Sequence, residues 1–234
     1  MIPFTPSDWP QNDLRQAAEL LWKWHRNARS NVPSRSVQNE AHRVCQKFDL
    51  PLHLVDLQLM KRNRDVIDTV PDLFDYMDSH VGSHALLLAK LAGYKANWAE
   101  TPVKEFGRAI FLTRSICFLK QDLQQGKHYI PIDVMKAHGV SIADLMNRSP
   151  SQNVRAVLWK QIVCARDAYA SCKTLNSDLN GWCQRRFRLY WTGGLDLLAR
   201  VESRKFNVWS KPPRLSLLRK THVYLQVYSG KVRR

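Results

Sequence analysis

The sequence is short of several features that would assign it to a class of protein. Its 234 residues include only 9 glycines, and few stretches alternate apolar with polar residues as a half-buried strand would. No run of about 18 apolar residues occurs, the length that a membrane-spanning helix needs. The most apolar run, Ala85–Leu91, is short and is broken by Lys90. These absences argue against a sheet protein and against a helical membrane protein.

The cysteines also lack a recognisable pattern. There are five, and no two have the Cys-x-x-Cys spacing; they are Cys45, Cys117, Cys164, Cys172 and Cys183. Most fall on the apolar faces of predicted helices. This pattern indicates reduced, buried thiols in an intracellular compartment rather than a disulfide framework or a zinc site.

Acidic residues are in the minority. The chain has 36 Lys and Arg against 20 Asp and Glu, which gives a formal net charge of +16. Such a surface attracts phosphate-rich partners or anionic membranes. The surplus gathers near the end of the chain, where residues 185–234 hold thirteen Lys and Arg and two Asp and Glu.

Three arginines within one helical turn, Arg185, Arg186 and Arg188, cannot all be neutralised locally. We therefore predict a contact with RNA or with an acidic protein. The candidate residues are Arg185, Arg186, Arg188, Arg204, Lys205, Lys211, Arg214, Arg219, Lys220, Lys231, Arg233 and Arg234. A basic surface without a specific partner explains the same charge, and the composition does not choose between these interpretations.

What the sequence does contain is helical periodicity. Apolar residues recur at the spacing of one helix face in residues 13–30, 37–48, 52–64, 71–92, 103–125, 152–172 and 179–201. Short helices are expected after Pro131 and Ser141, and an apolar, basic segment covers 215–227. Pro71 suits the first turn of a helix, and Gly93 suits the residue that ends one. The sequence predicts an all-α fold, with one helical domain over 1–204 and a basic C-terminal extension over 205–234.

One stretch is more specific than the periodicity. Residues 107–131 read GRAIFLTRSICFLKQDLQQGKHYIP. They resemble the second signature of the squalene/phytoene synthase family, N-x-x-R-D-x-x-x-D followed by G-R-x-Y-x-P. In that signature two carboxylates four residues apart share one helix face. Together they hold Mg²⁺, which binds the substrate diphosphate and draws it off as a leaving group.

The stretch keeps the frame of the signature and loses its chemistry. The resemblance places the asparagine at Arg114, the arginine at Cys117 and the first aspartate at Phe118. The second aspartate survives as Asp122, and the tyrosine of the closing turn as Tyr129. A phenylalanine cannot ligate Mg²⁺, and one carboxylate is a weak site for an ion that prefers six oxygen ligands. We therefore expect a pseudoenzyme with no catalytic residue, no metal and no cofactor.

The resemblance extends beyond this signature. Residues Tyr76–Ser83 are similar to a helix of the family that reads Y-C-x-x-V-A-G-x-V-G, although His80 and His84 are bulkier and would partly fill a pocket. The first aspartate-rich motif of the family is expected upstream of Leu21 and Trp22, so we expect the chain to lack it. The resemblance implies a single helical bundle of the isoprenoid synthase type, shortened at its N-terminus.

A non-catalytic branch of the family, which acts in the assembly of respiratory complex I, is a closer match. The shared segments include Leu21–Lys23, Gly139–Ser141 and Asn153–Arg155. That branch has also lost its metal-binding aspartates. The resemblance implies an assembly factor of the mitochondrial matrix, with other proteins of an assembly intermediate as partners and no small-molecule substrate.

Several alternatives stay open. The resemblance favours complex I as the assembled complex, whereas the charge favours a mitochondrial ribosomal subunit with an rRNA contact. Two other functions compete. One is a residual isoprenoid or prenyl-diphosphate binding protein or transferase, with Asp122 and Tyr129 near the mouth of its pocket. The other is a peripheral protein of the inner membrane that lays basic helices on anionic lipid.

Overall fold

The structure is a computed structural model that describes residues 11–28, 35–60, 65–94, 100–147, 150–179 and 181–228. Within these ranges all regular secondary structure is helical, apart from a single bridge between Val66 and His128. The predicted all-α fold is therefore confirmed. The elements are α1 (Gln11–Ala28), α2 (Arg35–Lys47), α3 (His53–Met60), α4 (Val70–Met77), the π-helical turn η2 (Asp78–Gly82), α5 (Ser83–Leu91), α6 (Glu100–Cys117), α7 (Leu119–Gln124), α8 (Ile132–Ala137), α9 (Ile142–Met146), α10 (Gln152–Ser171), α11 (Leu175–Asp178), α12 (Gly181–Ser203) and α13 (Leu217–Tyr228).

Several helix ends follow directly from the local sequence. Thr69 precedes α4 in an extended conformation and its hydroxyl accepts a backbone hydrogen bond from the first turn, where Pro71 lies as predicted. Gly93 follows α5 with a φ of 79°, a left-handed conformation that glycine adopts without strain. Ser141 begins α9 with a capping box, in which its side chain and that of Asp144 each bond the other's backbone N–H.

Two long helices predicted from periodicity are interrupted in the structure. Residues 71–92 form α4 and α5 with η2 between them, and residues 103–125 form α6 and α7 with a bend at Phe118. The turn η2 lies where two backbones approach closely: a Cβ atom added to Gly107 of α6 would lie 3.0 Å from the Val81 carbonyl oxygen. Periodicity does not reveal such interruptions, because they depend on contacts between separate segments.

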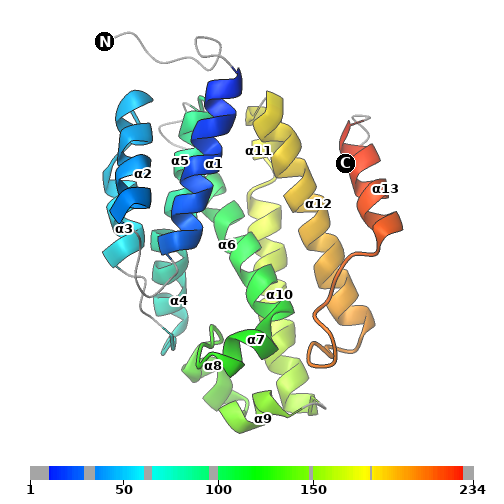
Figure 1. Ribbon diagram of the computed structural model, residues 1–234. Helices are drawn as coiled ribbons and strands as arrows, with labels where there is room; N and C mark the ends of the chain where they lie inside the picture. Colours follow the sequence, from blue (N-terminus) through cyan, green and yellow to red (C-terminus); the bar gives the residue numbers. More distant parts are fainter. Residues whose placement is uncertain are drawn as a thin grey trace.

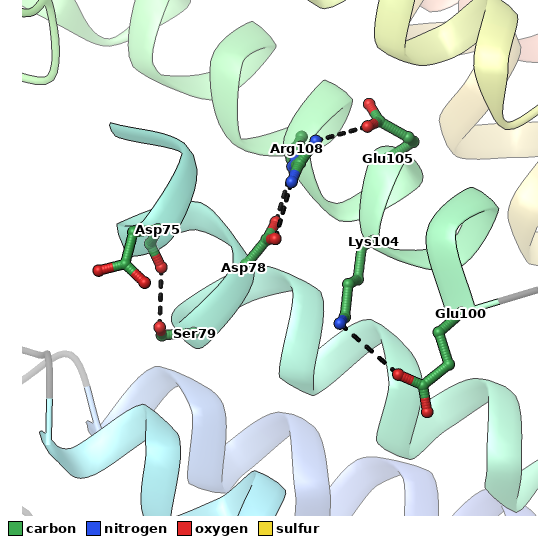
Figure 2. Close-up of polar contacts among 7 residues, drawn as sticks. All are labelled: Asp75, Asp78, Ser79, Glu100, Lys104, Glu105 and Arg108. Carbon is green, nitrogen blue, oxygen red and sulfur yellow. Dashed lines mark hydrogen bonds and ion pairs between the residues drawn. The ribbon is translucent and has the colours of Figure 1, made fainter. Parts of the chain in front are cut away.

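Polar contacts hold η2 against α6 (Figure 2). The Arg108 guanidinium donates to both carboxylate oxygens of Asp78, at 2.6 and 2.7 Å, and also to Glu105. On the preceding turn, the Ser79 hydroxyl donates to the carbonyl oxygen of Asp75 at 2.7 Å. Because Arg108 is partly buried, these charge-assisted bonds hold the turn more firmly than an exposed ion pair would.

The helices α6, α10 and α12 run side by side through the middle of the molecule (Figure 1). Helices α1 to α5 lie on one side of them, α13 packs against the outer side of α12, and the short helices α7 to α9 gather at one end. The core centres on the extensive α6–α10 contact, with Trp24, Phe111 and Tyr169 among its largest buried side chains. Across the described residues, no helix combines the length and the apolar character needed to span a bilayer.

Candidate functional site

The residues that resemble the family signature meet at the junction of α6 and α7. The bend at Phe118 brings together Arg114 on α6 and Asp122 on α7, which are eight positions apart. Two parallel hydrogen bonds join them, from Arg114 Nη1 to Asp122 Oδ2 at 2.7 Å and from Nη2 to Oδ1 at 2.9 Å. The Asp122 residue is only 3% exposed. A guanidinium therefore occupies both oxygens of the one motif carboxylate that the sequence retains.

The other altered positions of the signature supply no ligand in place of the missing aspartate. The Phe118 ring lies beneath the Arg114 guanidinium, 5.7 Å from its centre. Cys117 is buried, and burial raises the pKa of its thiol to about 12, so the side chain is a neutral thiol at neutral pH. The junction thus offers one neutralised carboxylate, an aromatic ring and a thiol, a poor set of donors for Mg²⁺.

A small pocket of about 210 Å³ opens beside this ion pair. Its walls are Tyr76, His80, Arg114, Asp122, Gln125, Lys127 and Tyr129. Tyr129 is buried, stacks on Tyr76 with ring centres 5.7 Å apart, and contacts Phe111 edge to face with ring centres 5.0 Å apart. Both cationic side chains of its lining are ion-paired, Arg114 with Asp122 and Lys127 with Asp65 at 3.7 Å, and its one carboxylate, Asp122, is therefore not free to bind a metal ion.

A cluster of three histidines lies next to this pocket. His25 of α1 stacks on His84 of α5 at 4.2 Å between ring centres and lies 5.6 Å from His80 of η2. His80 and His84 are almost completely buried. Burial, with the neighbouring His25 and His80, holds the pKa of His84 well below its ordinary value. Among the described residues, no three His, Cys, Asp or Glu side chains are arranged to hold a metal ion.

The expected loss of a first aspartate-rich motif stays a prediction. Near His25, the sequence has no Asp or Glu between Glu19 and Glu40. His25 of α1 contacts His80, which lines the pocket, so this stretch of the sequence has no carboxylate to offer there.

The structure distributes the predicted basic residues over several environments. Three are bound within the chain: Arg188 donates to the Asn176 side chain, Arg204 to Ser210 and to the Lys211 carbonyl, and Arg219 to both oxygens of Asp196. Lys205, Lys211, Arg214 and Lys220 are exposed. Lys231, Arg233 and Arg234 lie outside the described residues.

Arg185 and Arg186 have a different environment, because they line a groove between α1, α12 and α13. These arginines were not predicted to lie with the aromatic residues of that groove, such as Trp22 and Tyr228. Their separation along the chain leaves no local pattern by which the grouping can be found.

Comparisons with known proteins agree with the fold. The model of the squalene/phytoene synthase family matches residues 7–220. A crystal structure of a dehydrosqualene synthase with a bound ligand superimposes with a TM-score of 0.80 and 17% identity, covering 96% of this chain and 89% of that one. At this identity the likeness shows the fold, and it confirms the predicted isoprenoid synthase type of bundle.

Two curated proteins share detectable sequence similarity. A phytoene synthase of Thermus thermophilus is 24% identical over 147 residues, which cover 61% of this chain and 50% of that protein. The NADH dehydrogenase (ubiquinone) complex I assembly factor 6 of Mus musculus is 23% identical over 133 residues, which cover 55% of this chain and 40% of that protein. The matches therefore span half of these relatives or less, and one relative is named as an enzyme while the other is named as an assembly factor.

Proposed function

Because this chain belongs to the squalene/phytoene synthase family, we propose that it is a non-catalytic member that assists the assembly of a large complex in the mitochondrial matrix. The observation that carries the proposal is the paired hydrogen bonding of Arg114 to Asp122, at 2.7 and 2.9 Å. Similarity to a mouse complex I assembly factor supports the assembly role and the mitochondrial setting.

The ion pair of Arg114 with Asp122 competes with the binding of Mg²⁺, on which the chemistry of the family depends. Mg²⁺ would have to displace the Arg114 guanidinium from Asp122 and would find a phenylalanine, Phe118, where the signature has its other carboxylate. Each charge-assisted hydrogen bond contributes roughly 1.5–3 kcal/mol. A dication held through one carboxylate does not recover this energy, since Mg²⁺ needs several oxygen ligands.

Calorimetric titration of the purified protein with farnesyl diphosphate, with and without Mg²⁺, tests the loss of the enzymatic site. We expect no Mg²⁺-dependent binding. The matched variant restores the signature through Arg114→Asn, Cys117→Arg and Phe118→Asp, and metal-dependent binding by this variant alone would trace the loss to these positions. Mg²⁺-dependent binding and turnover by the unaltered protein would overturn the non-catalytic proposal and favour a prenyl transferase.

The assembly role is tested by sedimentation of mitochondrial lysate at low and high salt, with and without ribonuclease. Co-migration with complex I intermediates that resists ribonuclease supports complex I as the target. Co-migration with a ribosomal precursor that is lost at high salt or after ribonuclease supports the ribosome instead. Sedimentation as a free small protein under all conditions would contradict an assembly role of either kind.

A specific observation favours contact with a membrane surface as a second candidate function. The outer face of α13 carries Leu217, Leu218 and Leu225 with exposed fractions of 80%, 83% and 68%. No Asp or Glu follows Glu202 in the sequence, so the charged residues of α13 itself, Arg219 and Lys220, are both basic. An apolar stripe with basic flanks is typical of helices that bind anionic lipid.

Flotation with phosphatidylcholine vesicles that contain cardiolipin tests this second candidate. Replacing Leu217 and Leu225 by Glu should abolish flotation if α13 binds the lipid. The matched control replaces Ile142 and Met146 of α9, which are 48% and 50% exposed, by Glu. Equal flotation of both variants, or no flotation of the unaltered protein, would exclude a membrane role for α13.

A further inference from the structure

A groove of about 720 Å³ runs between α1, α12 and α13. Figure 1 shows how these three helices are arranged. Five aromatic side chains line it: Trp22 of α1, Trp182 and Tyr190 of α12, and Tyr224 and Tyr228 of α13. Trp22, Tyr190, Tyr224 and Tyr228 are 46–55% exposed. Large aromatic side chains are usually buried, so their gathering around one groove marks a surface that can accept a ligand.

The rings on α13 are arranged as a platform. Tyr224 and Tyr228 stack with ring centres 4.5 Å apart and planes 19° apart, and their hydroxyl groups are hydrogen-bonded at 3.1 Å. The Arg185 guanidinium of α12 lies 5.9 Å from the centre of the Tyr228 ring. Two helices therefore present aromatic faces and a guanidinium to the same groove.

The charge of the groove is positive. Arg15, Arg185 and Arg186 line it, against one carboxylate, Glu19. Arg185 and Arg186 are exposed, and neither forms an ion pair with any other described residue. Arg219 differs from them, because its charge is neutralised by the ion pair with Asp196.

From this juxtaposition we infer that the groove binds a short segment of single-stranded nucleic acid. Bases stack on the exposed rings and phosphates contact the arginines, which is how proteins hold single strands without reading their sequence. An acidic peptide would satisfy the arginines but leave the exposed aromatic rings without a matching surface. The groove is also unsuited to an acyl chain, because aromatic and charged groups make up most of its lining.

The inference adds a partner to the proposed assembly role and rests on that role for its biological setting. Binding can be measured on the purified protein alone, whereas the assembly role is measured in mitochondrial lysate, so the two can fail separately. Stacking and phosphate contacts do not distinguish RNA from DNA. We therefore expect both to bind as single strands, and a duplex, whose bases are already stacked, to bind at least about tenfold more weakly.

Fluorescence anisotropy of labelled oligouridine, oligothymidine and a duplex, with the full chain at low and physiological salt, tests the inference. Replacing Tyr224 and Tyr228 by Ala should weaken single-strand binding about tenfold, and replacing both by Phe should preserve it because the rings remain. Replacing Arg185 and Arg186 by Glu should cost about tenfold or more and reduce the dependence on salt.

A control with the same change of net charge replaces Arg155 and Lys160, which are exposed on α10, by Glu. It should weaken binding no more than about threefold, since these residues lie outside the groove. Circular dichroism checks that each variant is folded. Equal losses in the groove and control variants, equal affinity for the duplex, or no binding to either single strand would overturn the inference. Tighter binding of polyglutamate than of oligouridine would assign the groove to an acidic protein.

Discussion

At the residue scale, the pairing of Arg114 with Asp122 governs the junction of α6 and α7. We expect Arg114→Leu to lower the free energy of unfolding by about 2–3 kcal/mol, because it leaves a buried carboxylate unpaired. Urea denaturation measures the change. The control Arg155→Leu, at an exposed position of α10, should stay within about 0.5 kcal/mol of the unaltered protein. Equal effects of the two substitutions would show that the ion pair contributes nothing to stability.

The buried histidine His84 makes a prediction about pH at the same scale. Burial and the neighbouring His25 and His80 lower its pKa in the folded state, so the unfolded chain takes up the proton first. The free energy of unfolding is therefore highest above about pH 6.5, the ordinary pKa of histidine, and it decreases as the pH falls below that value. The loss is at most about 1.4 kcal/mol per pH unit, until the folded-state pKa is reached.

Urea denaturation at several pH values from about 7.5 down to 5.5 measures this effect. His84→Leu removes the titrating group and puts an apolar side chain in its place. The free energy of unfolding of this variant should therefore fall less steeply with decreasing pH. The control is the same substitution at His222, an exposed residue of α13. An unchanged slope in the His84 variant would contradict the role assigned to this residue.

At the element scale, two adjacent glycines of α12 show how a helix is seated in the bundle. A Cβ atom added to Gly194 would collide with the Tyr169 ring of α10, whereas one added to Gly193 would lie 3.8 Å from Leu215, an ordinary contact. Tyr169 cannot easily move, because it is buried and its hydroxyl is hydrogen-bonded to Thr113 at 3.2 Å.

We therefore expect Gly194→Ala to destabilise the protein by about 3 kcal/mol through overpacking. Gly193→Ala should be neutral or stabilising by up to about 1 kcal/mol, because alanine favours the helix. Thermal unfolding of the two variants side by side provides the measurement. Similar melting temperatures would mean that α12 is not packed against Tyr169 as described.

At the scale of the whole molecule, the net charge of +16 acts against compactness. Self-repulsion among cations is screened by salt, whose Debye length falls to about 8 Å at physiological ionic strength. We expect the melting temperature to rise by a few degrees between about 20 and 150 mM sodium chloride. Choline chloride at the same concentrations should raise the melting temperature by a similar amount. A falling melting temperature would mean that the ion pairs, such as that of Arg219 with Asp196, outweigh the repulsion.

Features that depend on neighbours along the chain could be predicted from the sequence. Helical periodicity, Pro71 in a first turn, Gly93 at a helix end and the cap at Ser141 are local effects, and the structure agrees with them. The change at Phe118 is also visible in the sequence, because a ligand is lost when its residue type is lost. Periodicity over 71–92 did not predict the turn η2, which lies where the backbone of Val81 closely approaches Gly107 of α6.

Which of these residues come into contact depends on the packing of the helices. The bend at Phe118 turns Asp122 toward Arg114, and a helix continued without that bend would have separated them. Equally, Trp22 and Tyr228 reach one groove from opposite ends of the chain, while Arg219, predicted to contact a partner, is bound to Asp196. The physical reason is that charge and aromatic character are properties of the residue, whereas proximity and exposure come from the packing of helices that are distant in sequence.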